Sequence, residues 1–236
     1  MKKLLIPFFV LVISLNISSQ NGRNGPTLWE EIIANSNLNY DNTKPQIIEA
    51  LKKYDSHQYL INRLSKNGQR YLFYTVSEAL KRDLPVELSL SPFIESQFDP
   101  YAQSSTGASG IWQFIPSTAI ENGLKKNWWY DARRDIVAST EAAYNFLVKL
   151  HQEHDDWLIA IAAYNAGPSR VRKEIRKNKA KGLPTDFWSL NLPKETKAYV
   201  PKILALSEVI RNPKSSNVEL PLSLIHISEP TRHTQI

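Results

Sequence analysis

The sequence predicts an all-α, mainly helical fold. Apolar residues recur three or four positions apart in most segments, as they do along one face of an α-helix, and strand patterns with a period of two are nearly absent. Serine or aspartate precedes several of these segments, at the position where such residues cap a helix, and Asp131, Asp135 and Asp156 are interpreted as helix-start residues. A chain of 236 residues is long enough for one sizeable core, so we expect one helical domain with short flanking segments.

The sequence signals for the first helices are weak. Residues 21–54 are rich in asparagine and carry two weak helical patterns, around 28–33 and 45–54, so they are interpreted as an N-terminal lead-in segment. Ser56 is a good N-cap for the helix that follows. The domain proper is therefore expected over residues 55–212.

Within this domain, helical spacing of apolar residues predicts a series of helices joined by loops. In chain order they are expected at 59–64, at 72–80, from 83–85 to Glu95, from Pro116 and Ser117 onward, at 135–151, at 157–165 and at 194–210. The basic stretch 170–181 is interpreted as a solvated helix face that leads into a loop.

Glu95 is the main candidate for acid chemistry. If the segment before it is one continuous helix, Leu84, Leu88 and Glu95 share a stripe. A carboxyl group on an apolar stripe loses water, which raises its pKa towards values suited to proton donation near neutral pH. A glutamate that turns outward into solvent is the alternative. Pro92 cannot donate a backbone hydrogen bond to Leu88, so we expect this helix to be kinked or broken there.

Four sequence blocks carry a family resemblance. The block around Glu95 is followed by the Ser/Gly-rich loop 104–116, by the block 162–168 and by the block 192–202. In this order and at this spacing they resemble the soluble lytic transglycosylase (SLT) domain family, closest to its membrane-bound D-type branch. The resemblance extends over roughly residues 55–212.

The resemblance implies a lysozyme-like helical fold, with at most a small irregular or β-like excursion near residues 103–110. It also implies a peptidoglycan lytic transglycosylase. In this family one carboxylic acid protonates the β-1,4 glycosidic oxygen between N-acetylmuramic acid and N-acetylglucosamine, and Glu95 matches that acid. The same group then deprotonates the muramic C6 hydroxyl, which attacks C1 and closes a 1,6-anhydro ring. Asp99 lies close in sequence, but it precedes Pro100, which favours a turn or cap role.

Further residues are implied as the lining of the glycan groove. The substrate-binding candidates are Ser104, Gln113, Tyr164, Asn165 and Glu195. Ser104 and Gln113 match positions that hydrogen-bond near the acid or to the sugar, although either could instead hold the loop. Glu195 could reach the groove from the last helix or could complement the dipole of that helix.

Aromatic residues and glycines of the same blocks allow two interpretations. Tyr164 matches the family tyrosine whose hydroxyl approaches the acid, while its ring would also suit a buried helix face. Asn165 could fix the loop that carries it. Trp112 could stack on a sugar or fill the core. Gly107 and Gly110 allow positive φ or a close approach of the backbone to a sugar.

The N-terminus has the layout of a secretory signal. Lys2 and Lys3 precede an apolar run that is followed by small residues, so residues 1–20 are predicted to be a signal peptide, with an uncleaved anchor as the alternative. Elsewhere no segment is long and apolar enough to span a bilayer, so no integral membrane segment is expected after cleavage. We therefore expect export to the periplasm or cell envelope.

The composition limits the classes of partner and cofactor. A formal net charge of +6 suits an anionic partner such as peptidoglycan glycan strands. Nucleic acid is not expected, because export argues against it and the basic residues are scattered apart from residues 170–181. No cofactor and no metal site are expected, since the chain has 0 cysteines and its five histidines lack a convincing ligand set.

Residues 213–236 are interpreted as a tail whose end, 222–232, resembles a translated sequencing adapter and is hypothesised to be an artefact. Two alternative functions stay open: a hydrolytic muramidase on the same fold, and a non-catalytic glycan-binding envelope protein. The acid in an apolar niche argues against the binding protein, which has no need of one.

Overall fold

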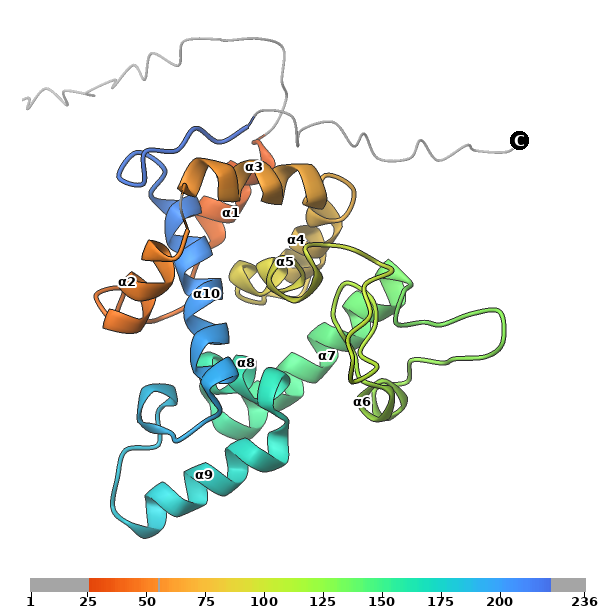
Figure 1. Cartoon of the computed structure of the whole chain (residues 1–236), viewed down its shortest axis with the longest axis vertical. Helices are drawn as coiled ribbons and strands as arrows, with labels where there is room; N and C mark the ends of the chain where they lie inside the picture. The colour runs from red at the N-terminus through yellow and green to blue at the C-terminus, as the bar shows by residue number, and fades with distance from the viewer. Residues whose placement is uncertain (1–25, 55, 222–236) are drawn as a thin grey trace, which may run out of the picture.

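Helices form all the long regular elements of the fold (Figure 1). A computed structural model describes residues 26–54 and 56–221. Within these ranges the β structure is limited to three isolated bridges, two between residues 103 and 114 and one between Lys126 and Asp131. The predicted mainly helical fold is confirmed, and the first two bridges give the expected β-like excursion.

The predicted signal peptide, 1–20, and the suspected artefact, 222–232, lie outside the described residues. In chain order the elements are α1 (Leu28–Asn35), α2 (Pro45–Lys52), α3 (His57–Gly68), α4 (Leu72–Lys81), the 3-10 helix η1 (Val86–Leu90), α5 (Ser91–Ser96), α6 (Pro116–Glu121), α7 (Ile136–His154), α8 (Trp157–Ala166), α9 (Pro168–Ala180), the 3-10 helix η2 (Phe187–Ser189) and α10 (Lys194–Arg211). The short η2 was not expected from the sequence.

Side-chain caps explain where several helices begin. Thr27 and Glu30 form a reciprocal capping box at α1, with hydrogen bonds of 3.2 and 2.7 Å. The predicted caps Ser56, Asp135 and Asp156 are confirmed, because each accepts a backbone hydrogen bond from the first turn of its helix. These bonds satisfy amide groups that have no partner inside a helix.

The segment leading to Glu95 is not one helix. It consists of η1 followed by a separate α5, in which Pro92 lies in the first turn, where proline is tolerated. The predicted break is therefore confirmed. The predicted stripe of Leu84, Leu88 and Glu95 is wrong, because a 3-10 helix and a new start at Ser91 shift the register.

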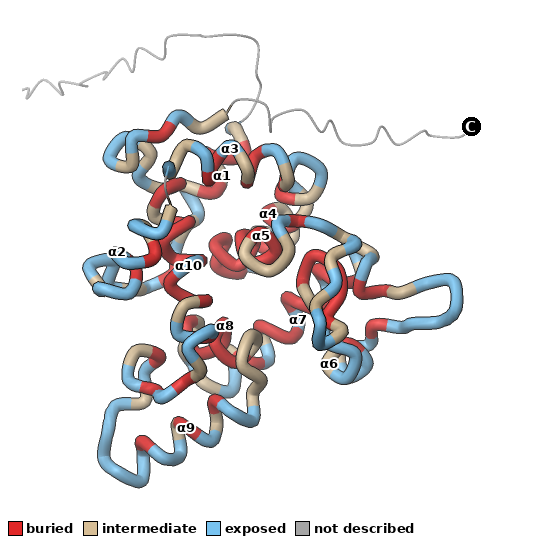
Figure 2. Tube along the Cα trace, viewed as in Figure 1, coloured by how far each residue is buried: buried red, intermediate tan, exposed pale blue. Residues whose placement is uncertain are grey.

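Helix α10 lies at the centre of the fold and contacts α1, α2, α5, α8 and η1 (Figure 1). Its buried residues run along most of its length, and Figure 2 shows them close to the buried start of α5. The region expected as a lead-in contributes Trp29, Ile32 and Ile47 to the same core, each almost completely buried. The Trp29 indole also donates a 2.9 Å hydrogen bond to the Pro221 carbonyl. This bond joins the two ends of the described chain beside α1, which itself packs on α10.

Candidate active site

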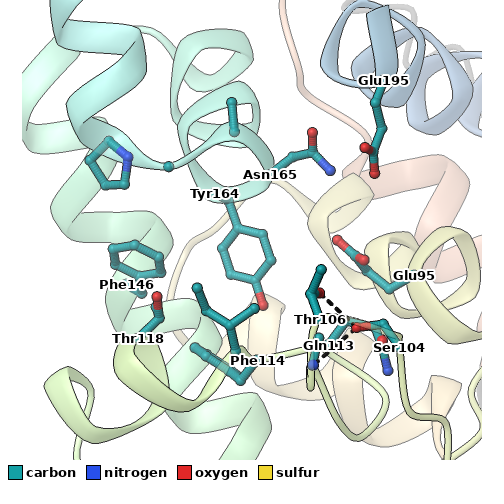
Figure 3. A pocket seen from close by; sticks show the side chains of 15 residues that line it. Glu95, Ser104, Thr106, Gln113, Phe114, Thr118, Phe146, Tyr164, Asn165 and Glu195 are labelled. Carbon is teal, nitrogen blue, oxygen red and sulfur yellow. Dashed lines mark hydrogen bonds between the residues drawn. The ribbon is translucent and has the colours of Figure 1, made fainter. Parts of the chain in front are cut away.

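A pocket of about 420 Å³ opens between α5, the loop 104–115, α6, α7, α8 and α10. Its lining includes all the predicted site residues, which come from four separate parts of the chain (Figure 3): Glu95, Ser104, Gln113, Tyr164, Asn165 and Glu195. Folding therefore brings these six side chains around one cavity.

Glu95 stands in the last turn of α5 and turns its carboxyl group into this pocket. Loss of water around the partly buried carboxyl raises its pKa from 4.5 to about 7. The negative charge of Glu195 adds to the rise, while the nearby Tyr199 hydroxyl acts in the opposite direction. Desolvation dominates, as predicted for a carboxyl in an apolar niche, although the niche is built by tertiary packing and not by a helical stripe.

Tyr199 is a neighbour of Glu95 that was not among the predicted site residues. It is buried on α10, and its hydroxyl makes no hydrogen bond of normal geometry within the described part of the chain. Burial together with the charge of Glu95 raises the pKa of this phenol well above its ordinary value. The available signal was a polar atom on the buried face of a helix that carries a family block.

Tyr164 combines both predicted interpretations. Its ring packs edge-on against Trp112 and Phe114 and lies tilted against Phe146. The hydroxyl does not bond to Glu95; it donates a 2.8 Å hydrogen bond to the Trp112 carbonyl. It nevertheless lies near enough for the Glu95 charge to contribute to its raised pKa, after burial.

Trp112 fills the core. Its side chain has 0% exposure, so it has no face for a sugar, and its indole donates a 2.9 Å hydrogen bond to Thr140. Its carbonyl accepts the Tyr164 bond, so the core residue also positions a residue of the pocket wall.

Internal hydrogen bonds hold the polar loop residues. The Ser104 hydroxyl accepts a hydrogen bond from the backbone amide of Ala108 at 3.0 Å. The side-chain amide of Gln113 donates a hydrogen bond to the Gly110 carbonyl at 2.8 Å. Gln113 also has a φ of 49°, which is unusual for a residue with a side chain. Both residues line the pocket while they hold the loop, so the two interpretations are compatible.

A buried arginine holds this loop in place by hydrogen bonds. Arg133 donates to the Gly107 and Phe114 carbonyls at 2.7 and 3.2 Å. Asp131 binds the same guanidinium at 2.7 and 2.9 Å, so its expected role as a helix-start residue is wrong. The Arg133 carbonyl lies so close to Gly110 that a side chain there would clash with it. Arg133 was missed because nothing in the local pattern separates it from a surface arginine.

The last two substrate-binding candidates, Asn165 and Glu195, lie on the wall opposite this loop. Asn165 accepts a 2.8 Å hydrogen bond from Thr196, which ties the end of α8 to the start of α10. Glu195 is exposed in the first turn of α10, and its carboxyl faces that of Glu95 across the pocket (Figure 3). Asp99 is exposed and accepts a 2.8 Å hydrogen bond from the Tyr101 amide, as a turn residue does.

Comparison with known proteins places this pocket in a family. The description "Transglycosylase SLT domain" matches residues 78–186. Membrane-bound lytic murein transglycosylase D of Escherichia coli (strain K12) is 45% identical over 199 residues, which cover 81% of this chain and 44% of that protein. A protein of Alteromonas sp. (strain M-1) named for tributyltin chloride resistance is 40% identical over 153 residues, which cover 64% of this chain and 73% of that protein.

The chain belongs to the transglycosylase SLT domain family. This confirms the family predicted from the four sequence blocks. The chain spans less than half the length of the E. coli relative. The solved lytic transglycosylase Slt of Pseudomonas aeruginosa, an inactive mutant, is 26% identical, with a TM-score of 0.42 over 65% of this chain and 25% of its own.

The SLT match covers Glu95, the polar loop and the end of α8, whereas Glu195 and Tyr199 on α10 lie beyond it. The side of the pocket that α10 forms therefore comes from outside the matched range. In the described part of the SLT chain, no group of three or more His, Cys, Asp or Glu residues is arranged to hold a metal ion. Among the same residues, no helix combines the length and apolar character needed to cross a membrane.

Proposed function

We propose that this chain is a lytic transglycosylase that acts on peptidoglycan, with Glu95 as the single general acid and base. The observation that carries the proposal is the pKa of Glu95, raised to about 7 inside a pocket lined by the other candidate residues. A carboxyl group with such a pKa is partly protonated at neutral pH, so it can donate a proton and then take one back.

In the proposed reaction, the Glu95 proton passes to the glycosidic oxygen between N-acetylmuramic acid and N-acetylglucosamine, and the bond from C1 to that oxygen breaks. The resulting carboxylate removes the proton from the muramic C6 hydroxyl. The C6 oxygen then attacks C1 and closes the 1,6-anhydro ring. Glu95 ends protonated, and no water is consumed.

The competing hydrolytic reaction needs a second carboxylate that activates water or attacks the sugar. Glu195 is the residue that supports this alternative, since its charge already acts on Glu95 from across the pocket. The proposed reaction does not need Glu195, because Glu95 serves first as the acid and then as the base. Glu195, with Ser104, Gln113, Tyr164 and Asn165, is proposed to contact the glycan instead.

Digestion of purified peptidoglycan, followed by mass spectrometry of the products, tests the proposal. The wild type is expected to produce anhydromuramoyl ends, which weigh one water less than reducing ends. Glu95→Gln is expected to lower the rate at least about 100-fold, because it removes general acid–base catalysis. Glu195→Gln is the matched control and should keep anhydro products.

Reducing ends that vanish in Glu195→Gln would support the hydrolase instead, and intact glycan with every variant would support the binding protein.

We further propose that the protein works in the cell envelope, after export to the periplasm, because its proposed substrate lies there. A mature protein found only in the cytoplasmic fraction of fractionated cells would contradict that location.

A further inference from the structure

The loop between α6 and α7 carries two exposed tryptophans. Trp128 and Trp129 are 88% and 90% exposed, and Figure 1 shows the loop projecting away from the helical body. Tyr101 from a neighbouring turn is 74% exposed and borders the same surface. Large apolar side chains that are adjacent and exposed to solvent indicate a contact surface.

The loop is held in a defined hairpin. The Asn127 side chain accepts hydrogen bonds from the Trp129 and Tyr130 amides, both at 2.8 Å, and the Asn127 amide donates to the Tyr130 carbonyl at 2.8 Å. Lys126 and Asp131 pair below this turn as a β-bridge. The tryptophans therefore stand at the two central positions of a tight turn, fixed at the tip.

The two indoles do not shield each other. Their ring centroids are 6.4 Å apart and the ring planes meet at 84°, so one edge faces one ring. Two perpendicular rings form no continuous flat face on which consecutive sugars could lie. They do form an apolar tip of two bulky rings, which can insert into an apolar phase.

Basic side chains outnumber acidic ones around the tip. Lys125, Lys126 and Arg134 are exposed. Two acids lie beside them: Asp131 is bound by Arg133 and lies 3.9 Å from the Lys126 ammonium, and Asp135 is bound by the first turn of α7 and the Tyr130 hydroxyl. A hollow of about 480 Å³, lined by Tyr101 and the hairpin, places Lys126 and Arg134 beside the aromatic rings, with Asp131 and Asp135 in the same lining.

We propose that this hairpin docks on the surface of a bilayer that contains anionic lipids. Tryptophan and tyrosine prefer the level of the lipid headgroups, and neighbouring lysines are attracted by anionic lipid. Trp128 and Trp129 enter the headgroup region while Lys125 and Lys126 face the phosphates. This is peripheral association without a spanning segment, and it does not depend on the proposed cleavage reaction.

Vesicle flotation tests the proposal with the full chain. The wild type is expected to float with vesicles of phosphatidylcholine and phosphatidylglycerol, and to bind less to pure phosphatidylcholine or at high salt. A double variant with Trp128→Ser and Trp129→Ser should bind at least tenfold more weakly. The control Leu183→Ser, which removes a half-exposed apolar side chain far along the chain, should bind as the wild type does.

A second measurement keeps the test independent of folding. Lipids brominated on the acyl chain near the headgroup should quench part of the tryptophan fluorescence in the wild type and not in the double variant, while both show the same thermal unfolding by circular dichroism. Equal binding by wild type and double variant overturns the proposal, as does a wild type that ignores anionic vesicles. Loss of binding to insoluble peptidoglycan alone would assign the tip to glycan.

Discussion

The environment of Glu95 shows how one residue obtains its chemistry from its neighbours. Its position at the end of a short helix places the carboxyl group where α8 and α10 keep most water away, and this desolvation is the main cause of the raised pKa. The two other groups that act on it, Glu195 and Tyr199, both belong to α10. The central helix of the fold therefore also tunes the acid.

The raised pKa predicts a pH-dependent stability. Because the folded pKa of about 7 lies above the ordinary 4.5, the folded state holds the Glu95 proton more tightly than the unfolded state. This contribution is fully present below pH 4.5 and is lost as the pH rises through 7. It amounts to at most about 3 kcal/mol, at 1.36 kcal/mol for each unit of pKa.

Urea unfolding of the wild type and Glu95→Gln between pH 4 and 8 measures it. The wild type should lose stability relative to the variant over this range, since glutamine does not titrate. A difference between the two proteins that does not change with pH would show that Glu95 is solvated and ionises normally.

Tyr199→Phe tests the role of the buried hydroxyl beside Glu95. The Tyr199 hydroxyl lowers the pKa of Glu95, so its removal should raise that pKa further. Activity carried by protonated Glu95 falls above pH 7, and in the variant this decline should move to higher pH. The measurement is the pH profile of glycan cleavage, and a lower rate with an unmoved decline would assign Tyr199 a packing role only.

At the scale of elements, the site depends on a loop that is held at fixed points. Gly110 has a φ of 82°, and a Cβ placed there would lie 1.8 Å from the Arg133 carbonyl. Arg133 in turn binds the carbonyls of Gly107 and Phe114. The segment after α6 thus supports the loop that carries Ser104 and Gln113.

Gly110→Ala is expected to destabilise the protein by more than about 3 kcal/mol, because strain at positive φ is joined by a clash with backbone. Gly123→Ala is the matched control: its φ is 78°, but nothing lies within 4 Å of the added Cβ. It should cost only about 1 kcal/mol. Thermal unfolding of both variants separates the clash from the strain, and equal losses would rule out the close packing on Arg133.

At the scale of the molecule, residues 26–54 take part in the core around α10. Trp29 is 3% exposed, lies in the core cluster and bonds to the Pro221 carbonyl near the other end of the described chain. Helix α2 packs directly on α10 as well. Loss of this cover would therefore affect the helix that carries Tyr199 and Glu195.

Trp29→Ala is expected to lower the free energy of unfolding by about 3 to 5 kcal/mol, as large-to-small changes of buried aromatics do. Trp128→Ala removes the same side chain from an exposed position and should change it by less than about 0.5 kcal/mol. Chemical denaturation compares the two. Similar small losses would mean that residues 26–54 only lie against the domain.

Most of the helices were predictable because their signals are local. Apolar spacing and the caps Ser56, Asp135 and Asp156 depend only on residues a few positions apart, and the structure agrees with them. The path of the chain into Glu95 was predicted less well. Its break at Pro92 is a local signal, whereas no local pattern marks η1 as a 3-10 helix, all five residues of which are buried.

The sequence by itself determined the helical class and the family blocks, because residue types and their spacing are enough to recognise them, and the resemblance carried by those blocks implied six of the residues that line the pocket. The tertiary structure alone decided that Arg133 is buried, that Trp112 belongs to the core and that Tyr199 faces Glu95. The reason is physical: burial, desolvation and the charge of a distant residue depend on contacts between segments far apart in the chain, and such contacts leave no periodic signal within any one of them.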